Sequence, residues 1–194
     1  MARTESIMLE LGSSAPDFSL PEPSTGRLRT LDELKGDKGT LVVFICNHCP
    51  YVLHILPTFV QMADAYQARG VSVVTINAND VVNYQSDSPE KMVELGIEYG
   101  FTFPYLYDES QVIAKEYHAA CTPDFFLFDA SLKLVYRGQF DAARPGSDVT
   151  VSGEDLNEAV TALVGSGKIL DTQYPSLGCN IKWKPGNEPE YYSV

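Results

Sequence analysis

The chain has 194 residues, of which 44% are hydrophobic, and it carries a formal net charge of −12. This length and composition predict a single domain over residues 1–194 whose core needs no disulfide bonds. Because an acidic surface repels a phosphate backbone, nucleic acid is excluded as an expected partner.

The N-terminal segment has no basic stretch followed by a long apolar core, and no later stretch is long enough to span a bilayer. We therefore expect a cytoplasmic protein that does not bind membranes. Since thiols are kept reduced in that compartment, two cysteines close together in sequence indicate catalysis or metal binding rather than a structural disulfide.

Hydrophobic runs and helical periodicity predict that strands and helices alternate along the chain. Residues 1–40 are rich in Pro, Gly and Ser and predict a loop or hairpin region ahead of the main fold. Buried strands are expected at 41–45, 71–76 and 103–108. Helices are expected at 50–69, from Ser88-Pro89 onward, and shortly after 108.

The later part of the chain predicts a β-hairpin, a last helix and a tail. The segments "FFLFD" and "KLVYR" read as the two strands of the hairpin. Ser152 and Asp155 resemble a capping box that opens a helix ending at Leu163, and an irregular tail follows from about 168 to 194. The order of elements predicts an α/β fold, with a mixed central sheet and helices on both faces.

The motif Cys46-Asn47-His48-Cys49 lies between the strand 41–45 and the helix 50–69. A helix N-terminus lowers the pKa of a cysteine, so we expect a thiolate at Cys46. Cys49 is one turn further on and within reach of a disulfide with Cys46. His48 should stabilise the Cys46 thiolate further and make that disulfide a better oxidant.

The segments "LGSSAPDFSL" and "LDELKGDKGTLVVFICNHCP" resemble the redoxin branch (AhpC/TSA type) of the thioredoxin superfamily, which includes peroxiredoxins and thiol–disulfide reductases. Together with "CTPDFFLFD" and "GCNIKWK", the segment "CNHCPYV" resembles the peroxiredoxin-like group that carries a CxxC motif. The resemblance covers nearly the whole chain and implies a thioredoxin-like fold. It also implies a cis-proline at Pro123, preceded by Thr122, whose backbone edge faces the dithiol and pairs with a substrate peptide.

The chain departs from both groups of relatives. Aligned on the peroxiredoxin pattern, Cys46 stands in place of the Thr or Ser and Val42 in place of the Pro, so both residues that position a peroxide are missing. Arg137 is a candidate for the peroxiredoxin arginine. The thioredoxin pattern is broken too, because the strand before Cys46 has no carboxylate and Ile45 replaces the Trp.

The expected enzyme is a thiol–disulfide oxidoreductase. Cys46 attacks a substrate disulfide, a mixed disulfide forms, and Cys49 resolves it. The expected partners are a protein or small-molecule disulfide or peroxide and a thiol reductant, with a homodimer left open; no cofactor or metal is expected. The supporting residues are Asn47, His48, Thr122 and Pro123.

Two alternatives remain open. The first is a peroxiredoxin-like thiol peroxidase with an antioxidant role, in which one cysteine of the motif becomes a sulfenic acid. Cys121 and Arg137 are then candidate additional redox or peroxide-site residues, although Cys121 equally fits a buried hydrophobe. The second is a non-catalytic redox-sensing or metal-binding module, since Cys46 and Cys49 have the spacing of half a zinc site. A resolving role for Cys179, in the irregular tail, is one of the alternatives left open.

Overall fold

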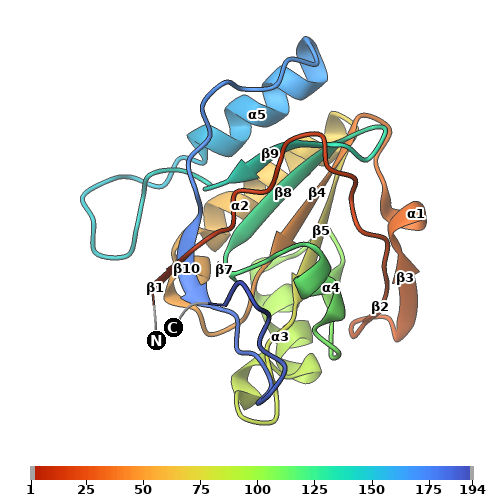
Figure 1. The fold of residues 1–194 in the computed structure, drawn as a ribbon, viewed down its shortest axis with the longest axis vertical. Helices are drawn as coiled ribbons and strands as arrows, with labels where there is room; N and C mark the ends of the chain where they lie inside the picture. Colours follow the sequence, from red (N-terminus) through yellow and green to blue (C-terminus); the bar gives the residue numbers. More distant parts are fainter. Residues whose placement is uncertain (1–2, 193–194) are drawn as a thin grey trace.

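The computed structural model describes residues 3–192 and is built around a five-stranded mixed sheet, with strand order β6-β5-β4-β8-β9 (Figure 1). Strands β4, β5 and β6 are parallel, and β8 and β9 continue the sheet in antiparallel pairs. This confirms the mixed sheet and the closing hairpin. The five strands are β4 (Gly39–Phe44), β5 (Val71–Asn77), β6 (Tyr105–Tyr107), β8 (Asp124–Asp129) and β9 (Leu134–Gly138).

Helices cover both faces of this sheet, because alternate side chains of each buried strand point to opposite faces. Leu41 and Val43 of β4 pack into one core with α2, α3 and α5. Val42 and Phe44 pack into the other core with α1 and α4. The helices are α1 (Leu31–Leu34), α2 (Pro50–Ala68), α3 (Pro89–Tyr99), α4 (Val112–Glu116) and α5 (Glu154–Gly165), with a short 3-10 helix, η1 (Gln85–Asp87).

Two small sheets complete the fold. The first 40 residues contain a hairpin, β2 (Ser19–Glu22) and β3 (Arg27–Thr30), as expected. The second small sheet joins the two ends of the chain to its middle: β10 (Leu177–Asn180) lies between β1 (Arg3–Glu5) and β7 (Cys121–Thr122), antiparallel to both. Most of the tail has no helix or strand, but β10 is a regular strand that the sequence did not predict.

The start of α5 differs from the prediction. Its N-cap is Gly153, with φ +65°, and no capping box forms between Ser152 and Asp155. A Cβ atom at Gly153 would lie 2.5 Å from the Phe140 ring, so the close packing requires glycine. The amides of Ser152 and Gly153 instead donate to the Asp141 carboxylate.

Among the described residues, no helix is both long and apolar enough to cross a membrane.

Candidate active site

The dithiol motif lies at the end of β4, where the chain turns into α2. Cys49 is the N-cap of α2 and Pro50 is its first residue, a position that suits proline because its missing amide hydrogen is not needed there. Neither Cys46 nor Cys49 is in a disulfide, and the two are only 1% and 0% exposed. The motif is therefore a reduced, buried dithiol at a helix N-terminus.

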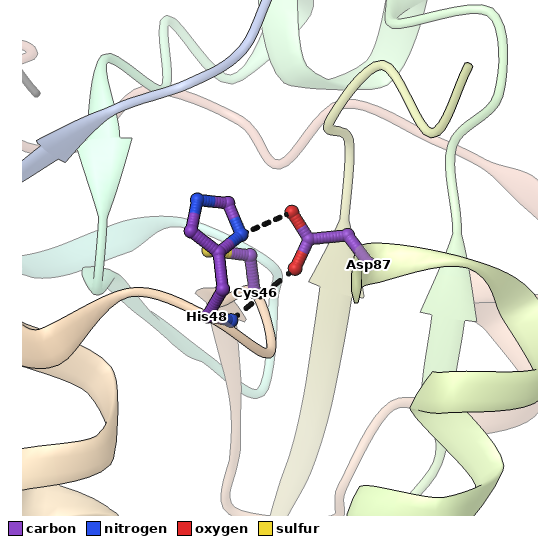
Figure 2. A group of neighbouring side chains, drawn as sticks. All are labelled: Cys46, His48 and Asp87. Carbon is purple, nitrogen blue, oxygen red and sulfur yellow. Dashed lines mark hydrogen bonds and ion pairs between the residues drawn. The ribbon is translucent and has the colours of Figure 1, made fainter. Parts of the chain in front are cut away.

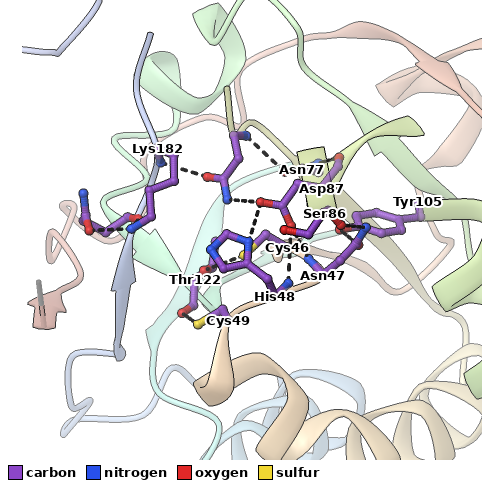
Figure 3. Close-up of polar contacts among 12 residues, drawn as sticks. Cys46, Asn47, His48, Cys49, Asn77, Ser86, Asp87, Tyr105, Thr122 and Lys182 are labelled. Atoms are coloured by element: carbon purple, nitrogen blue, oxygen red, sulfur yellow. Dashed lines mark hydrogen bonds and ion pairs between the residues drawn. The ribbon is translucent and has the colours of Figure 1, made fainter. Parts of the chain in front are cut away.

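The residue before the cis-proline contacts both sulfurs (Figure 3). The Thr122–Pro123 peptide bond is cis, which confirms the expectation drawn from the resemblance. The Thr122 hydroxyl lies 3.4 Å from the Cys46 sulfur, and the Thr122 carbonyl accepts a hydrogen bond of 3.1 Å from the Cys49 thiol. Thr122 and Pro123 thus face the dithiol as predicted.

The backbone edge beside the cis-proline is not open to a substrate peptide, contrary to expectation. β10 pairs with β7 along this edge, with Cys179 opposite Thr122 and Asn180 opposite Cys121. A Cβ atom at Gly178 would lie 2.0 Å from the Thr122 carbonyl oxygen, so only glycine allows β10 to come this close. The tail of the chain therefore covers the edge on which a substrate strand was expected to pair.

The thiol pKa values contradict the prediction that Cys46 is the more acidic cysteine. Hydrogen bonds with the Cys179 and Cys46 thiols lower the pKa of Cys49 to about 2. The hydrogen bond with Cys49, together with burial, raises the pKa of Cys46 well above its usual range. Since α2 begins at Pro50, Cys49 rather than Cys46 is nearest the amides of the first turn.

His48 is paired with a buried carboxylate that the sequence analysis missed. Its Nδ1 atom lies 2.7 Å from Oδ2 of Asp87, which is fully buried (Figure 2). The hydrogen bond with Asp87 raises the pKa of His48, against the lowering effects of burial and of Lys182. Asp87 compensates the charge of His48 and also raises the pKa of Cys46, so it opposes the thiolate stabilisation that was predicted for His48.

Asp87 also fixes the loop between the two cysteines. Its carboxylate accepts hydrogen bonds from the backbone amides of Asn47 at 2.8 Å and His48 at 3.3 Å, and from the Asn79 side chain at 2.8 Å. The Asn47 side chain donates to Ser86 and accepts from the Tyr105 hydroxyl (Figure 3). Asn47 and His48 are thus held in place by the segment that follows β5.

The tail contributes a cation near this network. Lys182 is buried, and its Nζ atom donates to the backbone and side-chain oxygens of Asn180 at 3.0 and 2.8 Å. The Lys182 amide donates to Asn79, which itself donates to Asp87. The end of β10 is therefore hydrogen-bonded into the same cluster as the dithiol loop.

Among the described residues, the hydrogen bonds of Cys121 and Arg137 go to partners other than the reacting sulfurs. Cys121 precedes Thr122 in β7, so its side chain points to the opposite face, where its thiol donates to the Pro123 carbonyl at 3.6 Å. Burial raises the pKa of Cys121 well above its usual range, which fits a buried hydrophobe. The guanidinium of Arg137 donates to the Leu9 carbonyl and the Gln173 side chain.

One group of described residues has the composition of a metal site. Single ligand atoms of Cys46, His48 and Asp87 lie within 4.8 Å of one another (Figure 2). This set differs from the zinc half-site suggested by the Cys46–Cys49 spacing. Since the Asp87 carboxylate already accepts three hydrogen bonds and is ion-paired with His48, a metal would have to displace groups that hold the dithiol loop.

A topological signal could have pointed to the missed residues. β4 and β5 are parallel neighbours, so the loops that follow them emerge at the same edge of the sheet. The first loop contains the dithiol, and the second, from Asn77 to Asp87, is rich in Asn and Asp. Polar residues in this second loop were therefore candidates for contact with Cys46 and His48.

Comparisons with known proteins extend this description. Residues 11–137 match the AhpC/TSA family. The thiol–disulfide oxidoreductase ResA of Geobacillus thermodenitrificans is 29% identical over 132 residues, which cover 68% of this chain and 70% of that protein.

Two solved structures carry the same fold. An uncharacterized conserved protein from Geobacillus kaustophilus is 48% identical with a TM-score of 0.93, over 95% of this chain and 98% of that chain. A thiol:disulfide interchange protein of the thioredoxin family from Chlorobium tepidum is 20% identical with a TM-score of 0.60, over 79% and 97% of the two chains. At that low identity, the second likeness shows the thioredoxin-like fold alone.

Proposed function

The chain belongs to the AhpC/TSA family within the thioredoxin superfamily, and on that basis we propose that its Cys46–Cys49 dithiol catalyses thiol–disulfide exchange. The observation that carries the proposal is the geometry of the two thiols. They are hydrogen-bonded to each other at the start of α2 and both contact the residue before a cis-proline. The similarity to a protein named thiol–disulfide oxidoreductase supports the same reaction class.

The first step generates a nucleophile at Cys46. The two sulfurs share one proton, and Cys46 is the nucleophile when that proton lies on Cys49. The Thr122 carbonyl, 3.1 Å from the Cys49 sulfur, accepts the new S–H group, and the Thr122 hydroxyl, 3.4 Å from the Cys46 sulfur, donates to the new thiolate.

The next steps move the disulfide from the substrate to the enzyme. The Cys46 thiolate attacks one sulfur of the substrate disulfide, forms a mixed disulfide and releases the first substrate thiol. Cys49 then attacks the Cys46 sulfur, and the second substrate sulfur leaves with the proton from Cys49. The products are a reduced substrate and a Cys46–Cys49 disulfide, which a thiol reductant returns to the dithiol form.

The substrate class follows from the covered edge. Because β10 occupies the strand beside Thr122, an extended peptide can pair there only after β10 moves away. We propose that the resting enzyme takes disulfides small enough to reach Cys46 without strand pairing, and that protein disulfides require displacement of β10. The cytoplasm, which supplies thiol reductants, is the proposed compartment. A homodimer stays an open part of the proposal.

Trapping of the mixed disulfide tests this function. A Cys49→Ser variant incubated with oxidised glutathione should accumulate one glutathione on Cys46, because the resolving thiol is missing. Intact-mass and peptide mass spectrometry identify the modified residue. The wild-type protein should release the glutathione and retain a Cys46–Cys49 disulfide. A variant that stays unmodified at Cys46 while its tertiary structure is intact would contradict the mechanism.

A thiol peroxidase is the second candidate, favoured by the lowered pKa of Cys49, because peroxides react with thiolates. Against it, the Arg137 guanidinium is engaged by Leu9 and Gln173. Stopped-flow mixing with hydrogen peroxide separates the two functions. Exchange predicts slow, non-saturating thiol loss, whereas a peroxidase predicts fast, saturable loss with a sulfenic acid on Cys49.

A further inference from the structure

The Cys49 sulfur has a second thiol neighbour besides Cys46. The Cys179 thiol, on β10, is hydrogen-bonded to Cys49, and all three cysteines belong to the same buried cluster. Cys179 is 3% exposed. Residues far apart in the sequence thus form a three-thiol cluster with Cys49 at its centre.

The strand register explains why Cys179 and not Cys121 reaches the dithiol. Cys179 is directly opposite Thr122 in the antiparallel pair of β10 and β7, so their side chains share a face. Thr122 itself contacts both Cys46 and Cys49. Asn180 and Cys121 are the next opposite pair and point to the other face.

Hydrogen bonds hold β10 in this register. The Ser176 hydroxyl donates to the carbonyl of Pro123 at 2.6 Å, and the Ser176 amide donates to the Ser6 hydroxyl at 2.8 Å. Gly178 presses against the Thr122 carbonyl, where a Cβ atom would lie 2.0 Å away. The position of Cys179 beside the dithiol is therefore fixed by the pairing and hydrogen bonds of β10.

We propose that Cys179 is a third redox thiol, which takes over the enzyme's disulfide by attacking Cys49. The proposal rests on the proposed function, since that reaction supplies the Cys46–Cys49 disulfide. β10 then acts as an internal substrate strand, pairing beside the cis-proline and presenting its own cysteine to the dithiol. Cys49 is the common partner of two alternative disulfides.

The step is an internal exchange that needs no added oxidant. The Cys179 thiolate attacks the Cys49 sulfur, the Cys46–Cys49 bond breaks, and the Cys49–Cys179 bond forms. Cys46 leaves as a thiolate and gains one proton, matching the proton that Cys179 lost. The products are one disulfide and one thiol, as in the reactants, and Cys46 is again available.

The electrostatics of the oxidised enzyme favour the attack. The largest cause that raises the pKa of Cys179 in the reduced protein is its hydrogen bond with Cys49. That cause disappears when the Cys49 sulfur is bonded to Cys46 and carries no charge. The nearby Lys182 ammonium lowers the pKa of Cys179 and remains in place.

A Cys46→Ser variant isolates the proposed pair. Reduced variant protein is incubated with oxidised glutathione, quenched in acid, alkylated and mapped by mass spectrometry without reduction. Cys49 should first gain a glutathione, which Cys179 then expels to leave a Cys49–Cys179 disulfide. The Cys46→Ser/Cys121→Ser variant should give the same disulfide, and the Cys46→Ser/Cys179→Ser variant should keep the glutathione on Cys49.

The outcomes separate this inference from the function on which it rests. A Cys46→Ser protein that keeps glutathione on Cys49 with Cys179 still alkylatable overturns the proposal. The Cys179→Ser variant must still form the Cys46–Cys49 disulfide; if neither it nor the wild type does, the proposed function itself fails. If the Cys46→Ser variant does not fold, the disulfides of partly oxidised wild-type protein are mapped by mass spectrometry instead. A disulfide-linked peptide that joins Cys49 to Cys179 supports the proposal. If only the Cys46–Cys49 disulfide is found, the proposal is overturned.

Discussion

The imidazole of His48 lies 2.7 Å from the carboxylate of Asp87, which no solvent reaches (Figure 2). The two residues are 39 positions apart, on the loop after β4 and on the 3-10 helix that follows β5. Through this pair, the protonation of His48 is linked to the conformation of the dithiol loop.

The His48–Asp87 pair predicts a pH-dependent contribution to stability. The pKa of His48 is raised in the folded state, so protonated His48 stabilises the fold fully below its unfolded pKa of about 6.5. That contribution is lost as the pH rises through the folded pKa. The difference in free energy of unfolding between wild type and His48→Gln should therefore be largest in mild acid and shrink above neutrality. Urea denaturation across this pH range measures it, and a constant difference would contradict the linkage.

Removal of the Asp87 charge should destabilise the protein. In Asp87→Asn, an amide group faces donors from Asn47, His48 and Asn79, so at least one buried donor loses its acceptor. We expect a loss of about 1–3 kcal/mol in free energy of unfolding. Asp171→Asn is the matched control, because Asp171 is exposed and forms an ion pair with the exposed Lys168. This substitution should change stability by less than about 0.5 kcal/mol.

Cys179 should control the acidity of Cys49. Its hydrogen bond is the largest cause that lowers the pKa of Cys49, so Cys179→Ala should raise that pKa. The rate of alkylation of Cys49 by iodoacetamide, measured against pH in a Cys46→Ser background, gives the titration. Cys121 is a buried cysteine on the other face of β7, so Cys121→Ala in the same background should not change the pH dependence of alkylation. If Cys179→Ala and Cys121→Ala give the same pH profile of Cys49 alkylation, the Cys179–Cys49 interaction is excluded.

Gly178 should control access to the dithiol. An added Cβ at Gly178 meets the Thr122 backbone, so Gly178→Ala should weaken the docking of β10. A cost of about 1–3 kcal/mol for overpacking corresponds to about a 5- to 150-fold rise in the open population. Alkylation of Cys46 and Cys49 should accelerate accordingly. Gly165→Ala, whose Cβ meets nothing within 4 Å, is the control and should not accelerate it.

The strands of the central sheet, the helices α2, α3 and α5, and the dithiol were predictable because each has a local signal. β-branched runs mark β4 and β5, and Ser88 with Pro89 marks the start of α3, whose N-cap is Ser88 as expected. The cis bond at Pro123 came from family resemblance, since sequence chemistry only permits it.

The rest of the site depends on contacts across the fold. Asp87 reaches Asn47 over 40 positions, and no periodicity links the two. β10 is four residues long, too short to show the alternation that predicts a strand, so neither the covered edge nor the place of Cys179 could be foreseen. The acidity of Cys49 follows from hydrogen bonds with Cys179 and Cys46, and the one with Cys179 exists only after β10 has docked.

A thiol redox titration tests the central claim most directly. The protein is equilibrated across glutathione buffers, alkylated and mapped by mass spectrometry. We predict a reversible Cys46–Cys49 disulfide with a potential less reducing than the thioredoxin value of about −270 mV, because hydrogen bonds to Cys49 stabilise the reduced form. If Cys46 never bridges to Cys49 at any glutathione ratio, thiol–disulfide exchange through this dithiol is contradicted.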